Sequence, residues 1–150
     1  MMKVFMFAAA VSFLTLVIGC GPQPKYGNFT KVDSQSLVND AVAMMLATYP
    51  PAQIRLNMLH EPNDAWGSKL VRVLRTHGYA MAEYSDKPKE KDKYAETGVD
   101  FAFILDEYRP EKEYNLTLFI GNDIVSRSYA LRGSNDSKVF VGLGQWSRRR

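Results

Sequence analysis

The segment YNLTLFIGNDIVSRSYAL, Tyr114–Leu131, predicts a β-hairpin. Its first half alternates apolar and polar side chains with a period of two, which is typical of a half-buried strand. Gly121 and Asn122 then supply a two-residue turn of the Gly-X kind. The second half places four residues on one face: Val125, Arg127, Tyr129 and Leu131. Arg127 in this apolar row is either at a sheet edge or a cation stacked on an aromatic ring.

Two helices are predicted upstream of this hairpin. The first begins at an N-cap, Asp33 or Ser34, and ends before Pro50-Pro51, because a residue that precedes proline avoids the helical region. The second begins at Asn63 or Asp64, and Gly78 is the residue expected just beyond its end. Its apolar side chains recur at helical spacing: Trp66, Leu70, Val73 and Leu74. These spacings predict amphipathic helices that cover a sheet.

Further strands are expected on both sides of the second helix. The predicted strands are residues 54–58, 79–84, 101–108, 114–120 and 123–131, with a short edge strand at 139–141. Residues 132–137 are expected to be a loop, and Trp146 an aromatic that pins the tail. The fold class is therefore α+β, with two helices packed on one side of a mostly antiparallel four- to five-stranded sheet.

The amino terminus has the plan of a secretory signal. Lys3 is followed by an uncharged and almost wholly apolar stretch, Val4–Ile18, which is short for a membrane span. Val17, Ile18 and Gly19 then precede Cys20, the only cysteine in the chain. This order resembles a bacterial lipobox, with an aliphatic residue at −3 and a small residue at −1.

The lipobox implies cleavage before Cys20 and attachment of diacylglycerol and a further acyl chain to that residue. The alternative is a short uncleaved anchor with an incidental cysteine. Several acyl chains make a stable membrane anchor, whereas one chain binds only marginally. Gly21 follows the cysteine in place of the aspartate associated with inner-membrane retention. We therefore expect a lipid anchor in the outer membrane, with the domain in the periplasm.

The rest of the chain is expected to form a single domain. Residues 1–19 are the signal peptide, residues 20–32 a flexible tether, and residues 33–150 one periplasmic α+β domain. A highly charged segment, residues 85–98, interrupts the domain and is expected to be a mobile, solvated loop, with a partner site as the alternative. Two aromatics in the tether, Tyr26 and Phe29, are candidates for packing on the domain or docking a partner.

The formal net charge of +3 falls by one when Lys3 leaves with the leader, which is too small a charge to indicate nucleic-acid binding. The basic signal is local and lies at the end of the chain, in Arg148, Arg149 and Arg150. Such a triplet is either a solvated tail or a contact for anionic lipid or an acidic partner.

The sequence carries none of the common catalytic or metal-binding motifs. His60 beside Glu61 indicates a surface contact rather than a dyad. Asp106 and Glu107 are adjacent on a predicted strand, so their side chains face opposite sides and form a poor acid–base pair. We therefore expect no enzyme activity, no metal, no cofactor and no small-molecule substrate.

Several stretches in order resemble the TrbH family of conjugal transfer proteins. They begin with the lipobox and end with GQWSRR, Gly144–Arg149, and they include four internal segments: YGNF at 26–29, YPPAQIRL at 49–56, DAWGSKLVRVLRTHGYAMAEY at 64–84 and ILDEY at 104–108. The hairpin 114–131 belongs to the same pattern. The charged segment 85–98 departs from the Ala/Pro-rich excursion common in the family, which weakens any shared role for this loop.

This resemblance implies an outer-membrane lipoprotein of a mating-pair-formation apparatus, a type IV secretion system. Such a protein would assist the assembly or stability of the transfer channel and bind its subunits, and it brings no catalytic residues. The alternative function is a periplasmic lipoprotein that activates or senses a cell-wall enzyme, which rests on fold-level analogy.

Overall fold

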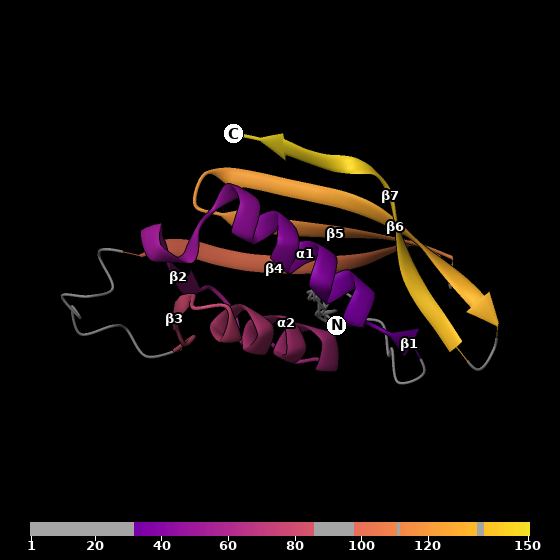
Figure 1. The fold of residues 1–150 in the computed structure, drawn as a ribbon, viewed down its shortest axis with the longest axis horizontal. Coiled ribbons are helices and arrows are strands. Elements are labelled where there is room, and N and C mark those ends of the chain that lie inside the picture. Colours follow the sequence, from indigo (N-terminus) through magenta and orange to yellow (C-terminus); the bar gives the residue numbers. More distant parts are fainter. Residues whose placement is uncertain (1–31, 86–97, 111, 135–136) are drawn as a thin grey trace, which may run out of the picture.

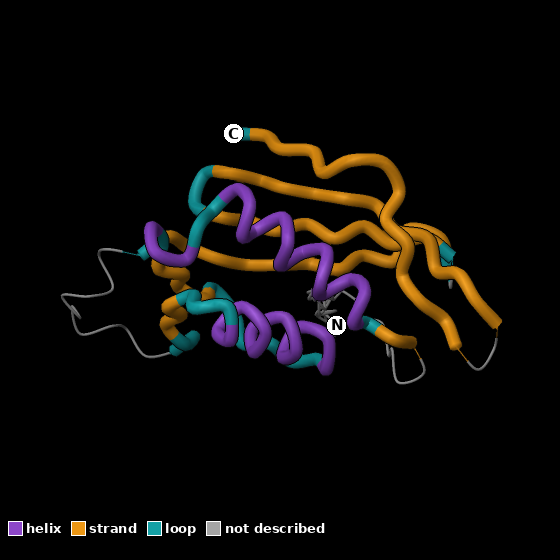
Figure 2. Tube along the Cα trace, in the orientation of Figure 1, coloured by secondary structure: helices purple, strands orange, loops and turns teal. Residues whose placement is uncertain are grey.

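The computed structural model describes residues 32–85, 98–110, 112–134 and 137–150. Helices and strands alternate at first, and four long strands follow (Figures 1 and 2). The helical elements are α1 (Gln35–Thr48), a 3-10 turn η1 (Pro51–Gln53) and α2 (Ala65–Thr76). The strands are β1 (Val32–Asp33), β2 (Arg55–Met58), β3 (Ala80–Ala82), β4 (Val99–Arg109), β5 (Glu113–Ile120), β6 (Asp123–Ser134) and β7 (Ser137–Arg149).

The described strands form one seven-stranded sheet in the order β1-β7-β6-β5-β4-β2-β3. The pairs formed by β4, β5, β6 and β7 are antiparallel, whereas β1–β7, β2–β3 and β2–β4 are parallel. The α+β class is confirmed, but the predicted four to five strands are too few. The two-residue β1 and the parallel pairing of β2 depend on contacts between segments far apart in sequence, which local periodicity does not report.

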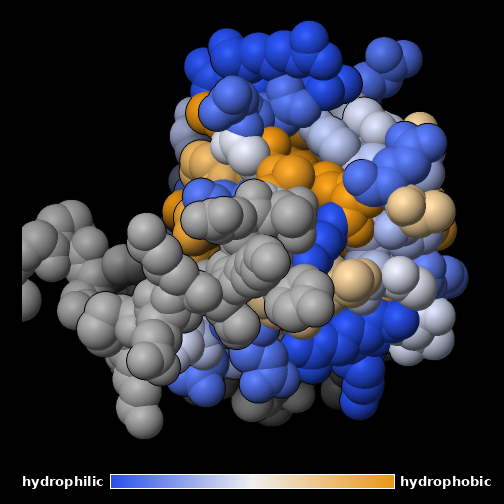
Figure 3. All heavy atoms as spheres, turned by 90° about the vertical axis from the view of Figure 1, so that its left-hand side faces the viewer, coloured by the Kyte–Doolittle hydropathy of each residue, from blue (hydrophilic) through white to orange (hydrophobic). Residues whose placement is uncertain are grey.

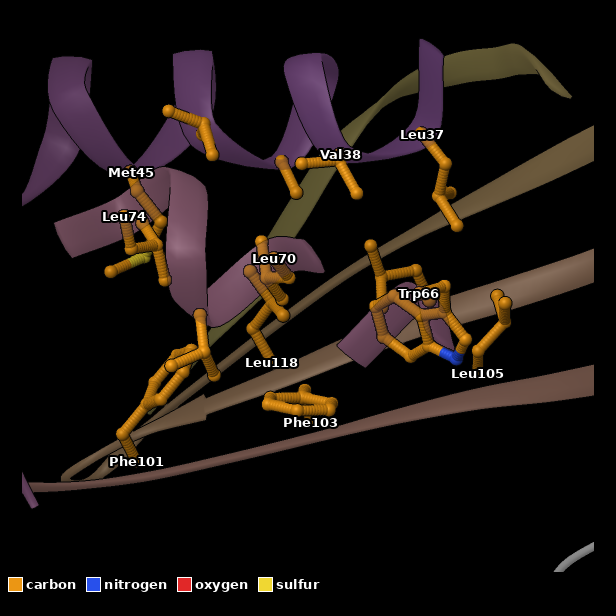
Figure 4. Close-up of a cluster of buried hydrophobic side chains, with 14 of the residues drawn as sticks. Leu37, Val38, Met45, Trp66, Leu70, Leu74, Phe101, Phe103, Leu105 and Leu118 are labelled. Atoms are coloured by element: carbon orange, nitrogen blue, oxygen red, sulfur yellow. The ribbon is translucent and has the colours of Figure 1, made fainter. Parts of the chain in front are cut away.

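Both helices lie on the same face of the sheet, as predicted (Figures 1 and 4). Their apolar side chains point down onto alternate residues of β4 and β5 (Figure 4). The buried residues drawn there are Leu37, Val38 and Met45 from α1, Trp66, Leu70 and Leu74 from α2, and Phe101, Phe103, Leu105 and Leu118 from the strands. This helix-covered face carries the hydrophobic core, and we call the opposite side of the sheet the distal face.

The second helix begins and ends at the predicted residues. Asp64 caps α2, because its side chain accepts a 2.6 Å hydrogen bond from the backbone N–H of Gly67. At the other end, Gly78 adopts a φ of +89°, the left-handed conformation that glycine takes without steric penalty. For α1, Ser34 is the N-cap position, but Asp33 accepts the 2.8 Å hydrogen bond from the N–H of Gln35.

The segment after the hairpin, residues 132–149, differs most from the expectation. The predicted loop 132–137 is largely strand, because β6 continues to Ser134 and β7 begins at Ser137. The predicted short edge strand 139–141 is part of the 13-residue β7, which contains Arg148 and Arg149. Beyond the two residues that pair with β1, Lys138 and Val139, the described part of β7 is therefore an edge of the sheet. Its register with β6 shifts between Ser126 and Ser128, and Gly144 has a φ of +65°. The ribbon of β7 bends along its length (Figure 1).

The hairpin of residues 114–131 forms as predicted. Strands β5 and β6 are joined by Gly121 and Asn122, and Gly121 has a φ of +58°. The predicted strand 79–84 is shorter, Ala80–Ala82, and the predicted strand 101–108 is longer, Val99–Arg109. Within the charged segment 85–98, residues 86–97 lie outside the described part of the chain.

Candidate functional site

The carboxyl-terminal arginines meet the rest of the domain at Asp123, the first residue of β6. Tyr49, at the end of α1, donates a 2.8 Å hydrogen bond from its hydroxyl to Asp123 Oδ2. Arg148 Nη2 donates to the same oxygen, and Arg150 Nε lies 3.3 Å from Oδ1. The guanidinium of Arg148 also lies over the Tyr49 ring, 5.3 Å from its centroid. One nearly buried carboxylate thus joins the last residues of the chain to α1.

Electrostatics favour one protonation state of this cluster. The hydrogen bond from Arg148, followed by that from Tyr49, holds the pKa of the Asp123 carboxyl below its ordinary value despite its desolvation. Burial, together with the hydrogen bond to Asp123, raises the pKa of Tyr49 to about 12. The carboxylate therefore stays charged and the phenol stays neutral across the ordinary pH range. Asp123 already receives three donors, so the cluster is built to hold strands and helix together.

A second polar cluster lies on the helix-covered face and joins α1 to β6. Arg127 Nη1 lies 2.8 Å from both carboxylate oxygens of Asp40, and the hydroxyl of Tyr129 donates to Asp40 Oδ2. The guanidinium carbon of Arg127 is 5.9 Å from the centroid of the Tyr129 ring. Burial and the hydrogen bond to Asp40 raise the pKa of Tyr129. The sequence left two alternatives for Arg127, a sheet edge or a cation stacked on an aromatic ring. The structure favours the second, with Tyr129 as the ring, and Arg127 also forms an ion pair with Asp40.

A glycine in β7 makes room for Arg127. A Cβ atom built on Gly142 would lie 2.5 Å from the guanidinium carbon of Arg127, well inside van der Waals contact. Only a residue without a side chain lets the arginine lie against the strand and still reach Asp40. This cluster links α1, β6 and β7 and, like the Asp123 cluster, holds the carboxyl-terminal strand against the core.

The arginine triplet is divided by the strand geometry. In the ladder with β6, Arg148 pairs with Val125, which is buried in the core, whereas Arg149 pairs with Ile124 on the distal face. Arg148 and Arg150 both bind Asp123, so Arg149 is the member that points the other way. Figure 3, viewed from the left of Figure 1, shows a hydrophilic band along its upper edge, at the height of the carboxyl terminus.

The remaining predicted site residues lie outside the described part of the chain. These are the lipidation residue Cys20, the signal-peptidase residues Val17, Ile18 and Gly19, and the tether aromatics Tyr26 and Phe29. Among the residues that are described, no helix is long and apolar enough to cross a membrane.

The titratable residues that the sequence offered as catalytic candidates contact other residues of the domain. His60 Nε2 accepts a hydrogen bond from the backbone N–H of Phe103, and its ring meets the Phe103 ring edge-on at 4.8 Å. Asp106 faces Asn115 in the ladder, whereas Glu107 accepts a 3.0 Å hydrogen bond from the hydroxyl of Tyr114. The expected divergence of these two carboxylates is thus confirmed. No group of three or more potential metal ligands occurs within the described ranges.

Sequence reasoning did not identify Asp40, Tyr49, Asp123 or Gly142 as members of these clusters. A charged residue in an otherwise apolar arc of a helix, as Asp40 is, was an available signal. Arg127 in an apolar strand face was a second signal, because a half-buried cation requires an anion opposite. No local pattern identifies Gly142, and none pairs Asp123 with Arg148 and Arg150, which lie 25 and 27 positions later.

A family model described as "Conjugal transfer protein TrbH" matches residues 22–150, which is nearly the whole chain. No curated protein and no solved structure matches it.

Proposed function

Because this chain belongs to the TrbH family of conjugal transfer proteins, we propose that it is an outer-membrane lipoprotein of the mating-pair-formation apparatus. In this role it assists the assembly or stability of the transfer channel through contacts with channel subunits. The observation that carries the proposal is the family match, which covers the folded domain and begins two residues after Cys20.

The amino-terminal sequence supports the anchoring part of the proposal. A charged start, an apolar stretch and Val17-Ile18-Gly19-Cys20 supply each feature that lipidation requires. An acylated Cys20 confines the domain to the membrane plane and raises its effective concentration near other envelope proteins. This is the behaviour expected of an assembly factor, which needs proximity and no turnover.

The folded domain supports a role in binding rather than catalysis. Its two polar clusters are internal ion pairs that attach β7 and α1 to the core. Arg149 is the arginine of the terminal triplet placed toward the distal face, so it is the member of the triplet most available to an acidic partner. Tyr26 and Phe29 remain proposed partner contacts near the membrane.

The test separates lipidation from sorting. In a donor strain, Cys20→Ser removes the acyl acceptor, whereas Gly21→Asp keeps it and introduces the residue associated with inner-membrane retention. We expect Cys20→Ser to release the protein from membranes and lower the transfer frequency, and Gly21→Asp to move it to the inner-membrane fraction. Lys25→Ala in the tether is the control and should behave as wild type. Undiminished transfer by Cys20→Ser would contradict the role of the anchor.

A further inference from the structure

A cross-strand row on the distal face combines an acid, an amide, a hydroxyl and an apolar side chain. The ladder places Asp106 of β4 opposite Asn115 of β5, Asn115 opposite Ser128 of β6, and Ser128 opposite Leu143 of β7. These four residues line one groove of about 600 Å³ together with Tyr108 and the neighbouring Glu107, Glu113 and Tyr114. Small-ligand sites in proteins have volumes of about 300–1,000 Å³.

The polar centre of this row is held in place by its neighbours. Asn115 Nδ2 donates a 3.1 Å hydrogen bond to Thr117 Oγ1, and Ser128 Oγ donates a 3.3 Å hydrogen bond to Asn115 Oδ1. A primary amide has two donors and two acceptor positions, so one donor and one acceptor of Asn115 remain for a ligand. Such a pre-oriented pair suits a hydroxyl group, which both donates and accepts.

An exposed aromatic ring stands beside these polar groups. Tyr108 is 75% exposed, the most exposed of the large hydrophobic side chains described, and it lies in β4 at the register shift between Glu107 and Arg109, two residues after Asp106. Leu143, at the other end of the row, is 40% exposed. An accessible ring next to fixed hydrogen-bonding groups is suited to a ligand with both apolar C–H faces and hydroxyls.

The charge of the row selects among ligand classes. Nucleic acids and anionic lipids are bound through Lys and Arg, but the lining of the groove has no cation and contains three carboxylates, those of Asp106, Glu107 and Glu113. The centre of a protein–protein interface is normally apolar and aromatic, whereas an amide and a hydroxyl occupy the centre here. A neutral polyhydroxylated chain meets these conditions, because its hydroxyl groups can donate hydrogen bonds to the carboxylates and to the Asn115 amide oxygen.

We propose that the groove of Asp106, Tyr108, Asn115, Ser128 and Leu143 binds a neutral glycan strand, with a sugar ring stacked on Tyr108 and its hydroxyls on Asn115 and Asp106. This site extends the proposed function, since a domain in the periplasm would contact wall glycan while anchored in the membrane. The binding itself does not depend on where the anchor inserts, so the two proposals fail independently.

The test uses the full chain purified in detergent and titrated with chitohexaose, a neutral β-1,4-linked sugar oligomer, by isothermal titration calorimetry. We expect saturable binding that Tyr108→Ala weakens about 5- to 10-fold, the loss of one stacking contact. Tyr108→Trp should retain binding. Tyr84→Ala removes another exposed tyrosine, 42% exposed and outside the groove, and should bind as wild type.

A second variant and a second probe keep the proposal falsifiable. Asp106→Asn keeps the hydrogen-bonding shape and removes one of the three negative charges of the groove, so it should bind chitohexaose within about twofold of wild type and weaken any binding of hexalysine. No binding of chitohexaose, or an equal loss in Tyr108→Ala and Tyr84→Ala, would overturn the proposal. Binding of hexalysine in place of the sugar would also overturn it and identify an acidic docking groove for a basic segment.

Discussion

The backbone of Gly142 lies directly against the guanidinium group of Arg127. A Cβ at position 142 would come within 2.5 Å of Arg127 Cζ and 2.6 Å of Nη2. This approach lets a cation from the middle of β6 pass beside β7 and bind Asp40 on α1 at 2.8 Å. The ion pair between α1 and β6 therefore depends on the absence of a side chain at position 142 of β7.

Gly142→Ala is expected to destabilise the domain, because the new methyl group forces Arg127 away from Asp40. Overpacking of this kind typically costs about 1–3 kcal/mol in the free energy of unfolding, measured by urea denaturation. The matched control is the same substitution in an Arg127→Ala background, where the obstructing guanidinium is gone. There Gly142→Ala should have an effect below about 0.5 kcal/mol, and an equal effect in both backgrounds would contradict the contact.

Asp40→Asn should lower the free energy of unfolding more than the loss of an exposed ion pair does. Asp40 and Arg127 side chains are 32% and 21% exposed, and Asp40 also accepts from Tyr129. Removing a hydrogen-bonded charge from a half-buried cation costs about 1.5–3 kcal/mol. Glu83→Gln, which removes the exposed partner of Arg75, is the control and should change stability by less than about 1 kcal/mol. Equal effects would show that the Asp40 cluster is no more stabilising than a surface pair.

Alkaline unfolding should report on Tyr49. Its pKa is raised to about 12 in the folded chain, against 10.0 for an unperturbed tyrosine, so folding favours the neutral phenol. The contribution of this group is complete below pH 10 and is lost as the pH rises from 10 through about 12. Tyr49→Phe should therefore flatten this part of the stability–pH curve, as followed by far-UV circular dichroism with urea. A curve parallel to that of wild type would contradict the assignment.

Acid unfolding should report on Asp123. Its pKa is lowered from 3.8 by Arg148 and Tyr49, so its contribution to stability is present above pH 4 and is lost as the pH falls through the depressed folded value. Asp123→Asn should lower stability at pH 7 and weaken its dependence on pH below 4. The same variant should make β7 more accessible to carboxypeptidase, because Arg148 and Arg150 lose their common acceptor. An unchanged rate of proteolysis would contradict the inference that Asp123 holds β7 against the domain.

Gly67→Ala tests why a glycine occupies the interior of α2. At an exposed helix position, Gly→Ala raises the free energy of unfolding by about 1 kcal/mol, because alanine is the better helix former. At position 67, however, the new Cβ would lie 2.8 Å from the Phe103 ring and from Asp64 Oδ1, so we expect net destabilisation of about 1–3 kcal/mol. Ser68→Ala, one residue along the same helix, is the control. A stabilised Gly67→Ala protein would show that Phe103 moves aside without penalty.

Local sequence patterns were sufficient for the elements whose causes are local. The Asp64 cap, the Gly78 stop and the Gly121-Asn122 turn each depend on the backbone preferences of one or two residues, and all three form as predicted. The amphipathic spacing of α2 likewise predicted which side of the helix faces the core. The predicted loop 132–137 failed for the opposite reason, because Gly, Ser and Asn indicate a turn, whereas pairing along the sheet extends both strands into it.

The sequence by itself determined the α+β class, the two helices, the hairpin and the family, because these follow from periodicity, capping residues and ordered motifs that neighbouring positions carry. Only the tertiary structure decided that the last residues form a sheet edge, that Asp123 binds Arg148 and Arg150, and that Arg127 passes Gly142 to reach Asp40. These contacts join residues up to 87 positions apart. Their partners are set by how the helices and strands stack, and no local pattern encodes the distance between such residues in space.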